Sequence, residues 1–410
     1  MRRAQSDIAI LFITRIIRLF AYGLISVILV LYLIHVGLDE KQIGLLLSLT
    51  LAGDAAISLW ITTSADRAGR RRMLMLGAGL MILSGGVFLA TNNPILLMAA
   101  AIVGVISPSG NEIGPFLSIE QAGLSQLLAD QKRTQVFAWY NLAGSFATAT
   151  GALASGWLAQ GLQASGLKTL ESYRVLLFGY AGAGALLILL FLCLSSSVEV
   201  TKKQHSNSSP LGLHHSRPVI FRLSLLFSLD AFAGGLIIQS IVAYWFHIKF
   251  GVAEGILGSI FFGANLLAGV SALLAARIAA RIGLINTMVF THIPSNILLM
   301  LVPLMPSLPL AIGLLMMRFS ISQMDVPTRQ SYTMAVVAPD ERSAASGVTT
   351  IARSVGASLS PALTGLLLAN PAFLGTPFFL AGGLKIIYDL LLYRSFRILK
   401  PPEEMQISNI

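Results

Sequence analysis

The hydrophobic positions of this chain run in long continuous blocks that do not alternate with polar positions. Blocks of roughly 20 mainly apolar residues, long enough for membrane-spanning helices, are bounded by charged residues, Pro, Gly or Asn. Runs such as LLILLFLCL (186–194) have no period of two, which excludes a β-barrel and leaves helices. Twelve spans are expected, at 8–34, 42–63, 73–91, 94–117, 136–160, 173–196, 219–246, 254–280, 287–306, 308–330, 343–369 and 376–396.

Composition agrees with a chain solvated by lipid. Of its 410 residues 55% are apolar and 11% are charged, whereas an ordinary soluble domain has about 25% charged residues. A soluble enzyme is therefore excluded, and the 37 Gly and 16 Pro are too few for a collagen-like or disordered chain. The lone Cys193 cannot form an intramolecular disulfide. The predicted fold class is an all-α membrane protein, a monomer embedded in the bilayer.

A polar segment after the sixth span divides the expected helices into two sets. The predicted organisation is an N-terminal six-helix lobe (1–196), a central linker (197–218), a C-terminal six-helix lobe (219–398) and a tail (399–410). Twelve spans place both termini on the same side of the membrane.

Basic residues give the orientation, because Lys and Arg near span ends are retained on the cytoplasmic side. With both termini inside, the outer loops receive only Lys41, Lys168, Arg174 and Lys249. The net charge of +10 therefore reflects membrane topology, and no nucleic-acid partner is expected. The expected location is the plasma (cytoplasmic or inner) membrane, with a multi-pass chain and both termini cytoplasmic.

The two sets of helices share a sequence pattern at nearly constant offset. A shift of 214 residues places Gly37, Glu40 and Gly44 on Gly251, Glu254 and Gly258. A shift of 209 places Gln121, Arg133 and Gly156 on Gln330, Arg342 and Gly365. The pattern predicts a duplication of two six-helix bundles in parallel orientation, since the shift spans an even number of helices.

The loop after the second span carries a recognisable motif. Residues 62–72 read TTSADRAGRRR, which resembles the signature loop of the major facilitator superfamily, G-x-x-x-D-R-x-G-R-R. Thr62 stands where the family has Gly, and the second-half copy (276–286) has lost the Asp. The resemblance implies a twelve-helix secondary transporter that works by alternating access, without a cofactor.

The same resemblance implies a conformational latch on the cytoplasmic side, formed here by Asp66, Arg67, Gly69 and Arg70. Antiporter branches of the family have a Gly-Pro-rich fifth helix, and the fifth span of this chain has no Pro. Two further latch residues come from the repeat, since the 209-residue shift sets Glu120 against Arg329. An ion pair between these two would form a gate; Glu120 could equally bind Arg67 or Arg70.

Charges inside the spans are candidates for function, because each costs at least about 2.5 kcal/mol near the bilayer centre. In a continuous tenth helix, Arg318, Asp325 and Arg329 would share one face. Pro327 would leave the carbonyl of Gln323 free to bind something else. The alternative is a purely structural pair between Asp325 and Arg329, four residues apart.

The fourth span contains Pro108, Gly110, Gly114 and Pro115, which predicts an interrupted helix beside Glu112. Glu112 is the leading candidate for a proton site, since a carboxyl group in a cavity can exchange a proton as water access changes sides.

Six further charged groups inside the spans are considered in pairs. Asp54 and Asp230 lie beside small residues, so each is either part of the solute and ion pathway or a buried hydrogen-bonded group. Lys385 and Asp389 are expected to pair, since they are four residues apart. Arg15 and Arg18 are expected to extend to the cytoplasmic interface.

The residues predicted to line the solute and ion pathway are Glu112, Asp230, Arg318, Gln323, Asp325 and Asp54.

The sequence contains no nucleotide-binding loop, nucleophile elbow or metal-ligand spacing, so neither an enzyme nor a metalloprotein is expected. The predicted function is secondary active transport of a small solute, coupled to protons, with efflux of drugs or metabolites preferred. The alternative is an uptake symporter for a small organic anion or sugar, favoured if Arg318 has no partner and by the missing fifth-helix motif. A non-transporting sensor or scaffold is the rival from another class.

Overall fold

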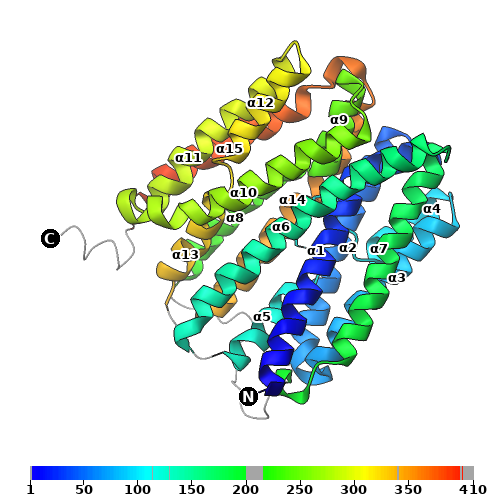
Figure 1. Cartoon of the computed structure of the whole chain (residues 1–410). Helices are drawn as coiled ribbons and strands as arrows, with labels where there is room; N and C mark the ends of the chain where they lie inside the picture. Colours follow the sequence, from blue (N-terminus) through cyan, green and yellow to red (C-terminus); the bar gives the residue numbers. More distant parts are fainter. Residues whose placement is uncertain are drawn as a thin grey trace. The chain divides into compact units, whose positions relative to one another are not determined.

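The computed structural model describes residues 2–112, 114–128, 130–199, 216–338, 341–397 and 399. Most of the predicted central linker and of the tail therefore lies outside the described residues. So do the side chains of residues 2–4, 66, 130–134 and 343, although the helices that contain them are described. Long helices dominate the described part (Figure 1).

The first half of the chain forms helices that match the first six predicted spans. They are α1 (Arg2–Val36), α2 (Glu40–Ala68), α3 (Arg70–Ala90), α4 (Pro94–Val103), α5 (Phe116–Leu127), α6 (Asp130–Ala164) and α7 (Thr169–Leu192), followed by the 3-10 turn η1 (Ser196–Val198).

The second half continues in the same way. Its helices are α8 (Arg217–Gly235), α9 (Gln239–Phe250), α10 (Glu254–Ile282), α11 (Leu284–Leu301), α12 (Leu308–Phe319), α13 (Asp325–Ala335), α14 (Arg342–Leu368) and α15 (Thr376–Phe396), with short 3-10 turns η2 (Val302–Leu304) and η4 (Pro371–Phe373).

Nine helical segments in the described ranges are long and apolar enough to cross a membrane, with α8 and α9 together forming one of them. The long helix α6 and two interrupted pairs, α4–α5 and α12–α13, account for the other three predicted spans. The all-helical fold class expected from the sequence is therefore confirmed.

Three predicted spans are interrupted. The break between α4 and α5 was expected, and Gly110 and Gly114 have φ values of +70° and +81° there, which favour glycine. The breaks at 236–238 and 320–324 were not expected, so the single helices predicted over 219–246 and 308–330 are wrong. The second of these breaks lies between Arg318 and Asp325.

Backbone contacts divide the chain into two compact units. The first contains residues 1–203 and 238–265, and the second contains 204–237 and 266–410. In the first unit α1 packs along α6 and α7, and α3 packs along α7. Gly23 and Gly151 make the α1–α6 contact close, because a Cβ atom at either would overlap the backbone of the other helix.

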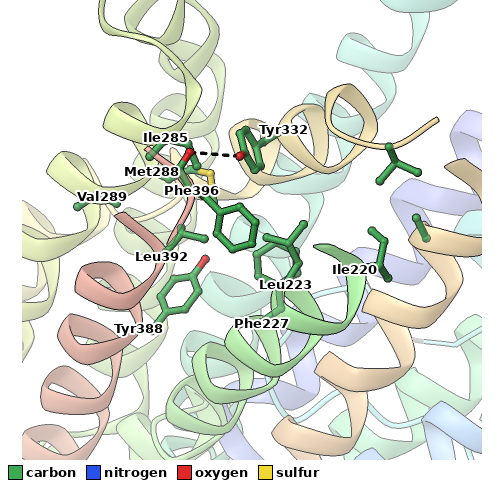
Figure 2. Packing of buried hydrophobic residues seen from close by; sticks show 12 residues of the cluster. Ile220, Leu223, Phe227, Ile285, Met288, Val289, Tyr332, Tyr388, Leu392 and Phe396 are labelled. Carbon is green, nitrogen blue, oxygen red and sulfur yellow. Dashed lines mark hydrogen bonds between the residues drawn. The ribbon is translucent and has the colours of Figure 1, made fainter. Parts of the chain in front are cut away.

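The second unit repeats this packing pattern. Here α8 packs along α14, and α11 packs along α15, which are the helices that the sequence duplication pairs with α1–α6 and α3–α7. Figure 2 shows its apolar core, in which the buried Phe227 of α8 and Tyr388 of α15 pack edge to face. The Tyr332 hydroxyl of α13 donates to the Phe396 carbonyl, 3.5 Å away (Figure 2). The lobe limits at 196 and 219 remain a prediction.

Candidate functional site

Two arginines of α1 and two glutamates form the first charge cluster, defined as Arg15, Arg18, Glu112 and Glu120. Arg15 and Arg18 are three residues apart and so share one face of α1. Each donates to the Glu112 carboxylate, at 2.8 Å and 2.9 Å. Arg18 also holds Glu120 through two parallel hydrogen bonds of 2.8 Å and 2.7 Å, the bidentate geometry that is strongest for this pair.

Aromatic and polar neighbours complete the first charge cluster. The Tyr140 hydroxyl and the Thr14 hydroxyl both donate to Glu120, the latter at 3.1 Å. The Arg15 guanidinium lies 4.3 Å from the centre of the Tyr140 ring and donates to Asn141 at 3.2 Å. Arg18 is completely buried. The expectation that Arg15 and Arg18 extend to the cytoplasmic interface is therefore wrong, because buried carboxylates hold both.

Glu120 does not have the partners that the sequence suggested. Its carboxylate is fully buried and is bound by Arg18, Tyr140 and Thr14, all within the first unit. Arg329 is bound to Asp230 and Asp325 in the second unit. In the structure Glu120 and Arg329 are thus each bound within their own unit, and the predicted pairings of Glu120 with Arg329, Arg67 or Arg70 stay a prediction.

Asp54, on α2, is the carboxylate beside the interrupted α4–α5 segment. Gly53 lets α2 touch α4 at Ile102, because a Cβ atom there would overlap the Ile102 carbonyl. The Asp54 side chain is half-buried and accepts from the Ser58 hydroxyl at 3.4 Å. Among the residues that the structure describes, no cationic side chain forms an ion pair with Asp54.

The second charge cluster is organised around one carboxylate and is defined as Asp230, Asp325, Arg329, Arg353 and Lys385. Asp230 on α8 accepts from Lys385 of α15 at 2.6 Å, from Arg353 of α14 at 3.0 Å and from Arg329 of α13 at 3.1 Å. Arg329 also donates to Asp325 at 2.7 Å. The expected pair between Asp325 and Arg329 is confirmed.

The expected pair between Lys385 and Asp389 is wrong, although both residues lie on α15. Lys385 binds Asp230, and Asp389 instead accepts from His292 of α11 at 2.9 Å. Asn296, one turn further along α11, donates to the second Asp389 oxygen at 3.4 Å. Both groups are buried, so a tertiary partner from another helix replaces the local i,i+4 contact.

Arg318 ends up apart from the pair with which it was expected to share a helix face. The break at 320–324 separates α12 from α13, so the continuous face of Arg318, Asp325 and Arg329 is wrong. The Arg318 side chain is 91% buried and lies 5.0 Å from the Phe319 ring centre. Gln323 lies within the break, where its backbone N–H donates to the Ser271 hydroxyl of α10 at 3.3 Å.

The motif loop is held by a residue that the sequence did not single out. Gly69, with φ of +101°, joins α2 to α3. The Glu199 carboxylate accepts from the backbone N–H groups of Arg70 and Arg71 at 2.8 Å and 3.2 Å. A carboxylate at the start of α3 satisfies free N–H groups and suits the helix dipole.

The remaining predicted latch residues occupy different environments. The Arg70 side chain donates to Gln126 at 2.9 Å and to the Val198 carbonyl at 3.2 Å. Arg67 is exposed, and the Asp66 side chain lies outside the described residues. The latch role of all four residues stays a prediction.

Residues 238–265 add polar contacts to the first unit, near helix ends that the predicted topology places outside. The two glutamates matched by the repeat each accept from a tyrosine: Glu40 from Tyr244 at 2.9 Å, and Glu254 from Tyr173 at 2.6 Å. Gly156 allows α6 to touch the start of α10, where a Cβ atom would overlap the Glu254 carbonyl. In the described ranges no three His, Cys, Asp or Glu side chains gather as metal ligands.

Sequence reasoning named most of these charges but missed several of their partners. Tyr140, Asn141, His292 and Glu199 were not singled out, because polar residues of these types are common at span ends and in loops. The available signal was spacing: His292 and Asn296 lie four residues apart, on one face of α11, and in the structure both reach Asp389.

Comparison with known proteins places this architecture in a family. The chain is 31% identical over 420 residues to the uncharacterized membrane protein YJR124C of Saccharomyces cerevisiae, covering 95% of this chain and 94% of that protein. The crystal structure of the nucleoside transporter NupG has a TM-score of 0.74 at 15% identity, covering 97% of this chain and 99% of that one. The D-xylose-proton symporter has a TM-score of 0.71 at 15% identity, covering 95% and 97%.

These two structural likenesses show the fold. A family model described as Major Facilitator Superfamily matches residues 11–361, which include the interrupted helices, the first charge cluster and all of the second charge cluster except Lys385. Members of this family move small solutes across membranes, and the chain belongs to the Major Facilitator Superfamily of transporters.

Proposed function

We propose that the chain is a proton-coupled secondary transporter of a small solute, with Asp54 as the group that gains and loses the proton. One observation carries this proposal. Five of the candidate carboxylates described above, Glu112, Glu120, Asp230, Asp325 and Asp389, have a cationic or His partner within 3.1 Å, and Asp54 has none among the described residues. It is also half-buried beside an interrupted helix.

The difference between Asp54 and Glu112 is the number of ion pairs that protonation would break. A proton on Glu112 would disrupt its pairs with both Arg15 and Arg18 and leave buried guanidinium groups with fewer anions. A proton on Asp54 breaks no ion pair, and the neighbouring Ser58 hydroxyl can hydrogen-bond either form. Asp54 therefore replaces Glu112 as the leading candidate for the proton site.

The surroundings of Asp54 support a role in a transport cycle. Interrupted membrane helices expose backbone groups near the midplane, and transporters use such segments for solute and ion sites. Gly53 brings Asp54 next to the α4–α5 break, where the backbone of Gly114 lies beside its carboxyl group. The D-xylose-proton symporter has the same fold, and that protein couples a solute to protons.

The membrane topology belongs to this proposal, with both termini cytoplasmic and the chain in the plasma membrane. The preference for efflux over uptake stays a prediction from the sequence.

Transport in proteoliposomes tests the proposal. Vesicles containing the purified protein receive a polar metabolite extract and an imposed pH gradient, and accumulated compounds are identified by mass spectrometry. We expect native protein to concentrate at least one compound, with a proton ionophore abolishing the concentration. Asp54→Asn should lose gradient-driven accumulation while still equilibrating the compound across the membrane.

Two variants give this experiment its controls. Glu171→Gln removes an exposed carboxylate on α7 and should behave as native protein. Glu112→Gln should lower the free energy of unfolding, and its main effect should not be on gradient-driven accumulation. If Asp54→Asn accumulates solute as well as native protein while Glu112→Gln does not, the proton site is Glu112 and the assignment to Asp54 is wrong.

A further inference from the structure

Among the described Arg and Lys side chains of the second unit that are not exposed, Arg318 is the one that forms no ion pair with a carboxylate. Arg329, Arg353 and Lys385 all bind Asp230. Arg318 is equally hidden, with 9% of its surface exposed, yet no described residue forms an ion pair with it. Its Nε atom is fully covered and has no hydrogen-bond partner there.

A guanidinium in this position requires an anion. Buried charges are paired in folded proteins, because an isolated one loses its hydration without compensation. Contact with the Phe319 ring at 5.0 Å supplies a modest cation–π attraction, far below the value of an ion pair. Asp325 does not fill the role, since its carboxylate is bound by Arg329 at 2.7 Å and forms no ion pair with Arg318.

A second orphaned group lies at the same helix break. The Ser322 side chain is 96% buried, and its hydroxyl has no partner among the described residues. Ser322 stands in the 320–324 break, four residues after Arg318. The break is fixed in place because the Gln323 N–H donates to Ser271 of α10.

The backbone adds a third source of positive potential. The 11-residue helix α13 begins directly after the break, and no side chain caps its first turn through its N-cap residue, Met324. A helix N-terminus offers free N–H groups and the positive end of the helix dipole, which together attract anions. Arg318, the Ser322 hydroxyl and this N-terminus therefore bring hydrogen-bond donors to one break, next to the Asp325 carboxylate, which is bound by Arg329.

We propose that the α12–α13 break is a subsite for an anionic group of the transported solute, a carboxylate, sulfonate or phosphate, held by Arg318 and Ser322. The substrate class is then a small organic anion. This inference rests on the proposed transport function and names its substrate.

The test uses the same proteoliposomes and polar metabolite extract, with four proteins compared. They are native protein, Arg318→Gln, Arg318→Lys and Arg342→Gln, the last being an exposed arginine of the same unit. We expect the compounds moved by native protein to carry an acidic group. Their initial uptake should fall by about tenfold or more in Arg318→Gln, the usual effect of losing a charge-assisted hydrogen bond.

The two remaining variants separate binding from folding. Arg318→Lys keeps the charge without the planar fork, so it should retain more uptake than Arg318→Gln and have a higher KM than native protein. Arg342→Gln should match native protein. Thermal unfolding of each purified variant shows whether the loss of uptake reflects a loss of fold, and we expect Arg318→Gln to be at least as stable as native protein because it removes an unpaired buried charge.

The possible results distinguish a failure of the anion subsite from a failure of the proposed transport function. Transport of a neutral or cationic compound, or equal uptake of an anion by native protein and Arg318→Gln, overturns the anion subsite and leaves the transport function standing. Absence of uptake of any compound by native protein overturns the transport function, and the subsite with it. If Arg318→Gln still couples the uptake of a neutral solute to protons, the anion class is likewise rejected, even where the variant has lost other uptake.

Discussion

Both charge clusters join helices through buried ion pairs, but equivalent helices carry charges of opposite sign in the two clusters. In the first, α1 supplies the cations, and Glu112 and Glu120 supply the anions. In the second, the equivalent helix α8 supplies the anion Asp230, and α13, α14 and α15 supply the cations. The 209-residue repeat places Glu120 and Arg329 at equivalent positions of the two halves. Glu120 binds α1 and Arg329 binds the equivalent helix α8, so the position forms an ion pair in both halves, with the sign of its charge reversed.

In this chain the repeat therefore places an ion-pairing residue at the same position of both halves, although the residue type differs. It also separates the two roles of a buried charge. Groups with two or three partners hold helices together, whereas Asp54 and Arg318 have no ion-pair partner in the described ranges. We place the proton on Asp54 and the solute anion at Arg318.

The largest expected effect comes from removing the hub of the second charge cluster. Asp230→Asn would leave Arg329, Arg353 and Lys385 without their shared anion, and breaking a buried pair in this way costs about 3–5 kcal/mol. Chemical denaturation in detergent should show this loss of unfolding free energy. A change below about 1 kcal/mol would mean that water hydrates these cations and that the hub does not bind the helices together.

A smaller effect is expected in the first charge cluster, where two arginines share the binding of the carboxylates. Arg18→Met should cost about 3 kcal/mol, because Glu120 loses its bidentate partner while Glu112 keeps Arg15. The double variant Arg18→Met/Glu120→Leu should recover part of that loss, since it removes both members of the pair. A double-mutant cycle in unfolding free energy measures the coupling, and additive losses would contradict a direct pair.

Lys385→Met should have a still smaller effect, about 1–2 kcal/mol, because Asp230 keeps two arginines. The contrast with Asp230→Asn is the informative quantity: the hub should cost at least twice as much as one of its cations. Thermal unfolding of the two variants under identical detergent conditions measures it. Equal losses would indicate that Lys385 alone neutralises Asp230.

The exposed pair of Arg174 and Glu171 sets the lower end of the scale. Its N–O distance is 2.9 Å, similar to the buried pairs, but its side chains are 27% and 51% exposed. Arg174→Ala should therefore cost less than about 1 kcal/mol, and the loss should shrink in high salt. A loss comparable to Arg18→Met would show that burial is not what distinguishes the clusters.

Sequence reasoning found the fold because its signals are local and periodic. Apolar blocks gave the spans, and the Pro and Gly residues around Glu112 gave the first interruption. The break at 320–324 contains neither Pro nor Gly, and a hydrogen bond from Gln323 to Ser271 on another helix helps to fix it. Local sequence carries no record of that partner.

The charge partners were predictable only where they were local. Asp325 and Arg329 pair as the i,i+4 rule expects. Lys385 instead binds Asp230, which is 155 positions away in the chain, and not Asp389. The difference is energetic, since Asp230 is buried among three cations and Asp389 has His292 and Asn296. Which carboxylate a buried lysine chooses depends on the packing of helices that a single chain does not reveal.

The single cysteine of the chain has a practical consequence for spectroscopic labelling. Cys193 lies at the end of α7, where it is exposed, and the chain contains no second thiol. A maleimide dye or spin label would therefore attach at one defined place in the native protein, with no background cysteines to remove. Adding one engineered thiol on α15 would provide a pair for spectroscopic distance measurements during turnover.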